Sequence, residues 1–160
     1  MIINDLPTTT NGGIYAIVNA ADFKIYIGMS GNLKRRAETH DTKLRNGNHE
    51  NTELLKDAEK NLRYIVLFED VENISRVYLQ VLEYLYMYVA LFYGFTLYNE
   101  IPGKRARSAE DFARRIFCIL TGGLNLKKHF NDVIKKEYGE PARHWQYKRK
   151  DRRPDADIFF

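Results

Sequence analysis

The sequence predicts a small α+β domain over residues 1–103, followed by a basic helical extension over residues 104–160. Three observations support this prediction. Residues 12–30 contain two period-two runs of β-branched and aromatic residues, which are typical of strands. Residues 64–68 form a short, fully apolar run, which predicts a strand covered on both faces. Residues 74–92 have apolar side chains at helical spacing, which predicts a buried central helix.

The two strand-like runs are joined by the polar connection 19–22, so we expect them to form a β-hairpin. With that connection Val18 lies opposite Phe23, and counting outward places Tyr15 directly opposite Tyr26. Both phenols then lie on one face of the sheet, because successive side chains of a strand alternate between faces. Taken alone, such a cross-strand pair is an ordinary packing contact.

A helix is expected directly after the hairpin, capped by Ser30 or Asn32 and ending near residues 46–47. Apolar residues at helical spacing supply its buried stripe: Leu33, Ala37 and Leu44. A short helix is expected to follow a turn and to begin at Asn51 or Thr52.

The first of these helices carries a polar face with candidate functional residues. Arg36, His40 and Lys43 are spaced so that their side chains lie together. Arg35 is the alternative to Arg36, but it points about 100° away from this face. For each histidine, here and at His49 in the following turn, ordinary surface polarity is the alternative interpretation.

The long apolar helix contains one carboxylate, Glu83, and no other charge lies between residues 77 and 99. A membrane span is disfavoured because the stretch also holds six tyrosines, Gln80 and Gly94. The apolar positions at helical spacing are Ile74, Val77, Tyr78, Val81, Leu85, Tyr88, Val89 and Phe92. Glu83 either lies at the solvent edge, pairs with a buried arginine, or binds a metal ion.

Charge is unevenly distributed along the chain. Residues 1–103 carry a net charge of −3, whereas residues 104–153 carry +9. A concentrated positive segment indicates a polyanionic partner. Within it, residues 108–121 and 124–138 predict helices, the second with Val133 and Ile134 inward and Lys135 and Lys136 outward.

Cysteine usage and the N-terminus bear on the cellular compartment. Cys118 is the single cysteine, which excludes an internal disulfide and a CxxC metal site and is typical of a reducing compartment. Residues 1–12 contain no signal-peptide pattern and predict a loose lead-in. We therefore expect a cytoplasmic protein.

The order of motifs resembles that of the GIY-YIG nucleases. Tyr15 stands in the tripeptide GIY and Tyr26 in YIG, and Arg36 follows on the next helix, where that family carries its catalytic arginine. The remaining residues that fit the family pattern are His40, His49, Glu83 and Asn99. The resemblance covers residues 12–99 and implies a three-stranded, mainly antiparallel sheet flanked by helices. It identifies no counterpart for the basic extension.

The resemblance implies a metal-dependent DNA endonuclease. Glu83 would hold one Mg²⁺ (or Mn²⁺), whose remaining ligands are waters. Arg36 would neutralise the scissile phosphate. Tyr15 would orient or deprotonate the attacking water, with Tyr26 assisting and His49 accepting a proton.

Several interpretations remain open at this stage. The enzyme could be a homing, phage-type or restriction nuclease or a structure-specific repair nuclease. Outside enzymes, a catalytically silent nucleic-acid-binding module and an assembly protein are the alternatives. We expect double-stranded DNA as partner, no membrane contact, and a homodimer or higher oligomer if both strands are cut. The candidate nucleic-acid-binding residues are Lys43, Lys104, Arg105, Arg107, Lys127, Lys128, Lys148, Arg149 and Lys150.

Overall fold

A computed structural model describes residues 1–99 and 132–136 of the chain. The elements in chain order are β1 (Ile3–Asn4), β2 (Gly12–Asn19), β3 (Lys24–Ser30), α1 (Leu33–Arg45), α2 (Thr52–Lys56), β4 (Leu62–Asp70), α3 (Arg76–Phe92) and β5 (Thr96–Leu97). The α+β fold class is confirmed.

The strands form one mixed sheet in the order β1-β4-β2-β3-β5. Its three long strands are antiparallel, with β2 in the centre, whereas the short β1 and β5 add parallel edges. The expected three-stranded sheet is therefore extended at both sides. The N-terminal segment, expected as a loose lead-in, contributes β1, which pairs with β4 and is also held by the buried carboxylate of Asp41. This carboxylate accepts hydrogen bonds from the backbone N–H groups of Ile2 and Ile3 at 2.6 and 2.9 Å.

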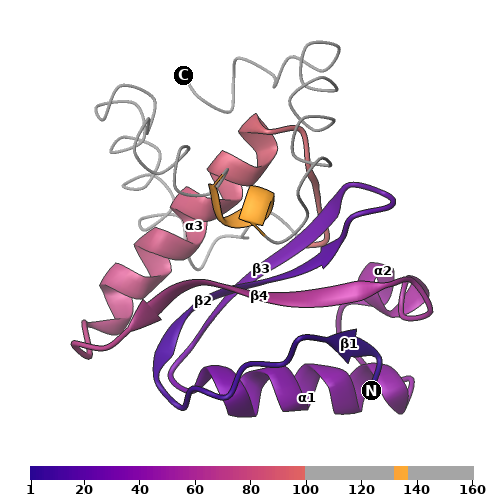
Figure 1. The fold of residues 1–160 in the computed structure, drawn as a ribbon, viewed down its shortest axis with the longest axis horizontal. Coiled ribbons are helices and arrows are strands. Elements are labelled where there is room, and N and C mark those ends of the chain that lie inside the picture. The colour runs from indigo at the N-terminus through magenta and orange to yellow at the C-terminus, as the bar shows by residue number, and fades with distance from the viewer. Residues whose placement is uncertain (100–131, 137–160) are drawn as a thin grey trace.

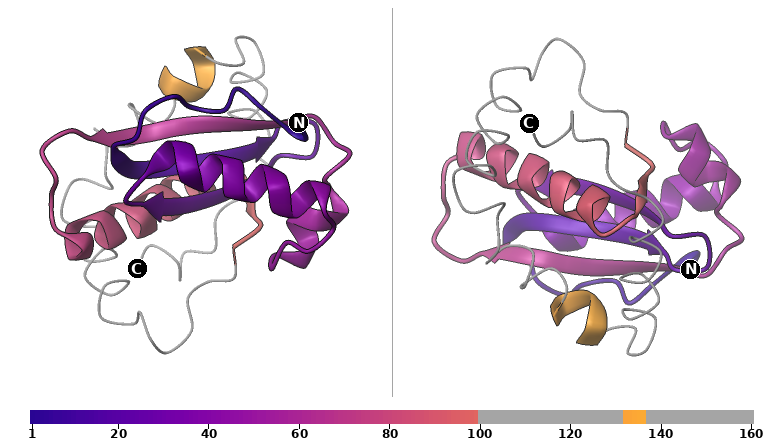
Figure 2. Two further views of the ribbon diagram at one scale, coloured as in Figure 1. Left: turned by 90° about the horizontal axis from the view of Figure 1, so that it is seen from below. Right: turned by 90° about the horizontal axis from the view of Figure 1, so that it is seen from above.

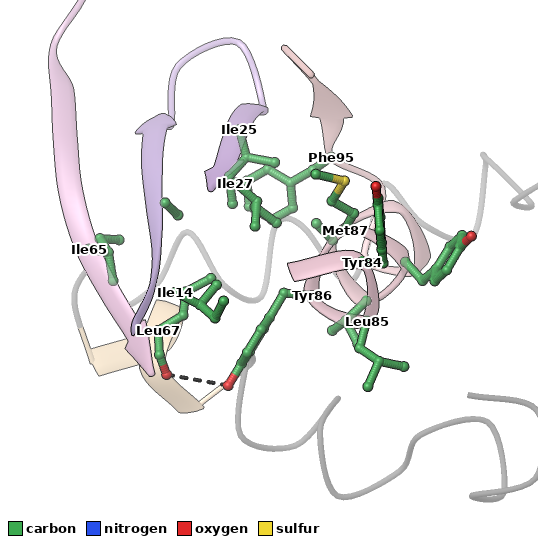
Figure 3. Packing of buried hydrophobic residues seen from close by; sticks show 14 of the residues in the cluster. Ile14, Ile25, Ile27, Ile65, Leu67, Tyr84, Leu85, Tyr86, Met87 and Phe95 are labelled. Carbon is green, nitrogen blue, oxygen red and sulfur yellow. Dashed lines mark hydrogen bonds between the residues drawn. The ribbon is translucent and has the colours of Figure 1, made fainter. Parts of the chain in front are cut away.

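Helices cover both faces of the sheet. Helix α1 lies against one face and α3 against the other, as Figures 1 and 2 show from three directions. The α3 face buries the larger apolar cluster, which includes Ile27, Leu67 and Tyr86 (Figure 3). There the Tyr86 hydroxyl donates to the Leu67 carbonyl at 3.3 Å. The α1 face buries a second cluster that contains Tyr15 and Tyr64. Strand β4 is thus covered on both faces, as its apolar sequence predicts.

The hairpin register differs from the predicted one. Asn19 pairs with Lys24, so Tyr15 lies opposite Gly28, and Tyr26 lies opposite Ile17. The cause is the position of the turn. The connection comprises residues 20–23 and not the expected residues 19–22. There the Asn19 amide bonds to the side chain and backbone N–H of Asp22. Moving both strands by one residue preserves which side chains share a face, so the two tyrosines remain diagonal neighbours with ring centroids 6.2 Å apart.

Two apolar positions of the predicted central helix do not belong to its buried face. Val77 and Tyr78 are 65% and 64% exposed, and Leu79 is the first buried residue of α3. Ser75 caps α3 by accepting from the Tyr78 N–H. No helix in residues 1–99 or 132–136 has the length and apolar composition needed to cross a membrane.

One short piece of the basic extension is described. Residues 132–136 are helical, Ile134 is buried in the α3-side core, and Lys135 and Lys136 are exposed. This agrees with the predicted pattern for those five positions. The other predictions for the extension lie outside the described residues, including its eight candidate DNA contacts: Lys104, Arg105, Arg107, Lys127, Lys128, Lys148, Arg149 and Lys150.

Candidate active site

Tyr15 is the centre of a polar cluster on the α1 side of the sheet. Its ring is fully buried and stacks on Tyr64 with centroids 4.9 Å apart and planes 10° from parallel. Its hydroxyl lies directly over Gly28, where an added Cβ would come within 2.5 Å of the phenol oxygen. Glycine in YIG is therefore the residue that lets the phenol cross β3.

Helix α1 supplies two partners of the Tyr15 hydroxyl from successive turns. The Arg36 Nε–H donates to the phenol oxygen at 3.0 Å, and the His40 Nε2 lies 2.7 Å from the same oxygen. The helical spacing that suggested a shared face is confirmed by these contacts. Arg35, the alternative arginine, is exposed and lies outside this cluster.

A second histidine extends the hydrogen-bonded chain. His40 Nδ1 lies 2.7 Å from His49 Nε2, and the two rings stack with centroids 5.0 Å apart. The chain ends at a backbone donor, because the Asn51 N–H donates to His49 Nδ1 at 3.0 Å. Tyr26 packs edge-on against His40, with ring centroids 5.4 Å apart.

This cluster opens on a cleft of about 540 Å³. The cleft is lined by Tyr26, Arg36, His40 and His49, and by residues 50–53 at the start of α2. Tyr15 is not among the lining residues, whereas its neighbours Arg36, His40 and Tyr26 are.

The protonation states in this cluster follow from burial. Burial raises the pKa of the Tyr15 phenol above its ordinary value, and the nearby Arg36 charge offsets only part of that increase. Burial, followed by the positive charge of Arg36, lowers the pKa of His40 to about 3. Burial also lowers the pKa of His49, although Glu50 opposes the shift. At neutral pH the site therefore holds a protonated phenol and two neutral imidazoles.

Glu83 approaches the same region from the opposite face of the sheet. Its carboxylate accepts a hydrogen bond from the Met29 backbone N–H and lies in a second cavity, of about 670 Å³. Burial raises the pKa of Glu83 to about 7, against the effects of the Met29 bond and the Arg36 charge.

A hard divalent cation fits this carboxylate. Within residues 1–99 and 132–136, no three His, Cys, Asp or Glu side chains group together as a ready-made metal site. An ion at Glu83 would therefore have one protein carboxylate and otherwise oxygen ligands from water or phosphate, which is the pattern Mg²⁺ accepts. Burial disfavours the ionised form of this carboxylate, and a divalent cation would offset that effect.

Two other predicted site residues make contacts within the domain. Asn99 donates to the Ile27 carbonyl at 2.6 Å and accepts from the Ile27 N–H at 2.9 Å, so its amide holds β3 in place. Lys43 forms an ion pair with Glu50 beside the cleft. Its charge is thereby partly compensated.

Sequence reasoning missed two contributors to the site. Tyr64 supports the Tyr15 ring, but only the β2–β4 register shows that they share a face. Asn51 was expected as a helix cap, and its side chain does accept from the Leu54 N–H at 2.9 Å. The role of its backbone N–H toward His49 leaves no signal in the sequence.

Comparison with protein families identifies the part of the chain that forms this site. Residues 11–87 match the family model of the GIY-YIG catalytic domain, so this part of the chain is a GIY-YIG domain, a phosphodiester-hydrolysing endonuclease domain. The matched range includes Tyr15, Tyr26, Arg36 and Glu83, and Asn99 lies beyond it. Searches of curated proteins and of solved structures found no match.

The buried histidines predict a pH-dependent stability. His40 and His49 bind fewer protons in the folded than in the unfolded state, so their stabilisation is present above pH 6.5 and is lost as the pH falls through the folded pKa. For His40 that folded pKa is about 3. Each can contribute a slope of up to about 1.4 kcal/mol per pH unit. Glu83 gives the opposite slope, because its raised pKa favours protonation in the fold.

Denaturant titrations between pH 7 and pH 4 measure this effect. His40→Gln should reduce the loss of unfolding free energy on acidification, relative to the wild type and to the exposed α1 control Thr42→Ala. Identical pH slopes for all three proteins would show that His40 is not held neutral by the fold.

Proposed function

We propose, on the premise that residues 11–87 are a GIY-YIG nuclease domain, that this protein is a metal-dependent DNA endonuclease. The observation that carries the proposal is the direct contact of Arg36 with Tyr15 at the cleft, with Glu83 facing the same strand end from α3. A divalent cation bound at Glu83, with Mg²⁺ the best fit and Mn²⁺ the alternative, would supply Lewis-acid stabilisation of the leaving oxygen.

Arg36 acts on the phosphate. Its Nε–H is donated to Tyr15, and its side chain also hydrogen-bonds Tyr26. The terminal N–H groups that Tyr26 does not use would bind nonbridging oxygens. The phenol oxygens of Tyr15 and Tyr26 outweigh the effect of burial and raise the pKa of Arg36, which keeps it cationic. A fixed guanidinium at the cleft stabilises charge that grows on the phosphate during attack.

The tyrosines act on the attacking water. Tyr26 lines the cleft, whereas Tyr15 lies beneath it. Because the raised pKa keeps Tyr15 protonated at neutral pH, it orients water as a hydrogen-bond donor. Loss of its proton requires added positive charge, which Arg36 and a cation at Glu83 provide.

Substitution of Glu83 tests the metal requirement. Wild-type protein should cleave plasmid DNA with Mg²⁺ and lose this activity in EDTA. Glu83→Gln should lower Mg²⁺-dependent cleavage by roughly 100-fold or more, since loss of a residue that only supports a metal ligand already costs about 10- to 100-fold. DNA binding in a gel-shift assay should be retained. The matched control is Gln80→Ala, since Gln80 lines the same cavity. Equal cleavage by Glu83→Gln and wild type would overturn the metal assignment.

The neighbouring arginines provide a matched pair for the phosphate contact. Arg36→Lys keeps the charge but removes the Nε–H that bonds Tyr15 and the terminal N–H groups proposed for the phosphate, so single-turnover cleavage should fall by roughly 100-fold. Arg35→Lys changes an exposed residue of the same helix and should leave the rate within about twofold. Similar losses in both variants would mean that the effect is not specific to the Tyr15 contact.

The basic extension is the proposed source of DNA affinity. Residues 1–103 carry a net −3 and residues 104–153 a net +9, so long-range attraction to a polyanion comes from the extension. Complete removal of residues 104–160 is a poor test, because it would also remove Ile134 from the core.

Charge neutralisation tests the extension without that complication. The triple variant Lys104→Gln, Arg105→Gln, Arg107→Gln should reduce the slope of log affinity against log salt by about 2 to 3, since each lost phosphate contact removes about 0.9. The control is the exposed pair Lys34→Gln, Lys56→Gln in α1 and α2. An unchanged slope in the triple variant would show that these residues do not contact DNA.

A further inference from the structure

The hydrogen-bonded chain from Asn51 to Tyr15 has a fixed direction. A backbone N–H can only donate, so His49 Nδ1, which receives the Asn51 N–H at 3.0 Å, must be the bare nitrogen of a neutral ring. His49 then carries its proton on Nε2 and donates it to His40 Nδ1 across 2.7 Å.

The same reasoning extends to the tyrosine. His40 accepts at Nδ1, so its proton is on Nε2, and that N–H donates to the Tyr15 oxygen at 2.7 Å. Arg36 Nε–H donates to the same oxygen at 3.0 Å. Tyr15 therefore accepts two hydrogen bonds, and its own O–H remains to donate elsewhere.

We infer that Asn51 and His49 are positioning residues that hold His40 in the Nε2–H tautomer, so that His40 serves Tyr15 as a hydrogen-bond donor and not as a base. The consequence for cleavage rests on the proposed nuclease function. In this arrangement the Tyr15 proton is directed away from His40, and a tyrosinate formed there is met by two N–H donors.

The opposite polarity is excluded by one contact. If His40 accepted the Tyr15 proton at Nε2, its Nδ1–H would donate to His49 Nε2. The His49 proton would then be on Nδ1 and would face the Asn51 N–H, placing two donors against each other at 3.0 Å. The expectation that His49 accepts a proton relayed from Tyr15 is therefore replaced by donation in the reverse direction.

The surroundings support neutral imidazoles in this chain. The charged groups that act on the pKa of His40 are Arg36 and Lys43 of the same helix and Glu50 of the following turn, and the two cations disfavour a further positive charge. Lys43 and Glu50 also pair with each other, which reduces the influence of both. Tyr15 and Tyr26 pack on the ring from the strands.

The direct test is the tautomer itself, read from long-range ¹H–¹⁵N correlation spectra of the full chain at pH 7. His40 and His49 signals are assigned from the spectra of His40→Gln and His49→Gln. Both rings should carry the proton on Nε2. A proton on Nδ1 of either ring, or a doubly protonated ring, would overturn the inference, whether or not the protein cleaves DNA.

A matched pair of substitutions tests the functional consequence. His49→Gln retains an N–H donor at about the position of Nε2, whereas His49→Met has a similar size and no donor. His40 should remain the Nε2–H tautomer in His49→Gln and should lose that preference in His49→Met. Cleavage should fall roughly 10- to 100-fold more in His49→Met than in His49→Gln. This is the range expected when the hydrogen bond from His40 Nε2–H to the charged Tyr15 oxygen is lost.

The outcomes separate the two claims. Nε2–H tautomers in a protein that cleaves no DNA would contradict the proposed function and leave the hydrogen-bond direction intact. If the protein is active, equal cleavage rates and equal His40 tautomers in His49→Met and His49→Gln would contradict the positioning role. The wild-type spectrum decides the tautomer even if His49→Met does not fold.

Discussion

The register of β2 against β3 is the constraint on which the site depends. Placing Tyr15 opposite Gly28 lets the phenol lie across the neighbouring strand, because no Cβ occupies that space. The hydroxyl then reaches the face of α1 that carries Arg36 and His40. A side chain on residue 28 would collide with the phenol, so the glycine is required by packing and not by backbone conformation. Helix α1 and the hairpin are therefore matched to each other through one close contact.

Much of the fold was predictable because it is encoded in local patterns. Period-two runs predicted β2 and β3, a short apolar run predicted β4, and caps predicted α1 and α2 almost to the residue. The short edge strands β1 and β5 were not predicted as sheet members, because two residues carry too little periodicity. Val77 and Tyr78 show that a periodic pattern can also predict too much burial. They fit a helical stripe, yet only the position of the sheet decides where burial begins.

The site was predictable to the level of side chains on a shared face, and no further. Helical spacing predicted that Arg36 and His40 share a face of the helix, and the hairpin predicted that Tyr15 and Tyr26 share a face of the sheet. The exact pairing of the tyrosines depended on where Asn19 starts the turn, which a count of loop residues does not reveal. The contribution of Asn51 is made by its backbone, so the identity of its side chain carries no information about it. Glu83 could be singled out because a lone carboxylate in an apolar helix requires a reason.

Asn99 has a consequence for how the sheet ends. Strand β5 pairs with β3 at Lys24 and Ile25 only, and the Asn99 amide then bonds both backbone groups of Ile27. A primary amide offers one donor and one acceptor as a peptide unit does, so this side chain continues the ladder where the strand stops. The outer edge of β3 is thereby closed beside Gly28. An open edge there could recruit a strand from another molecule, so the residue that shapes the site also protects the protein from edge-to-edge aggregation.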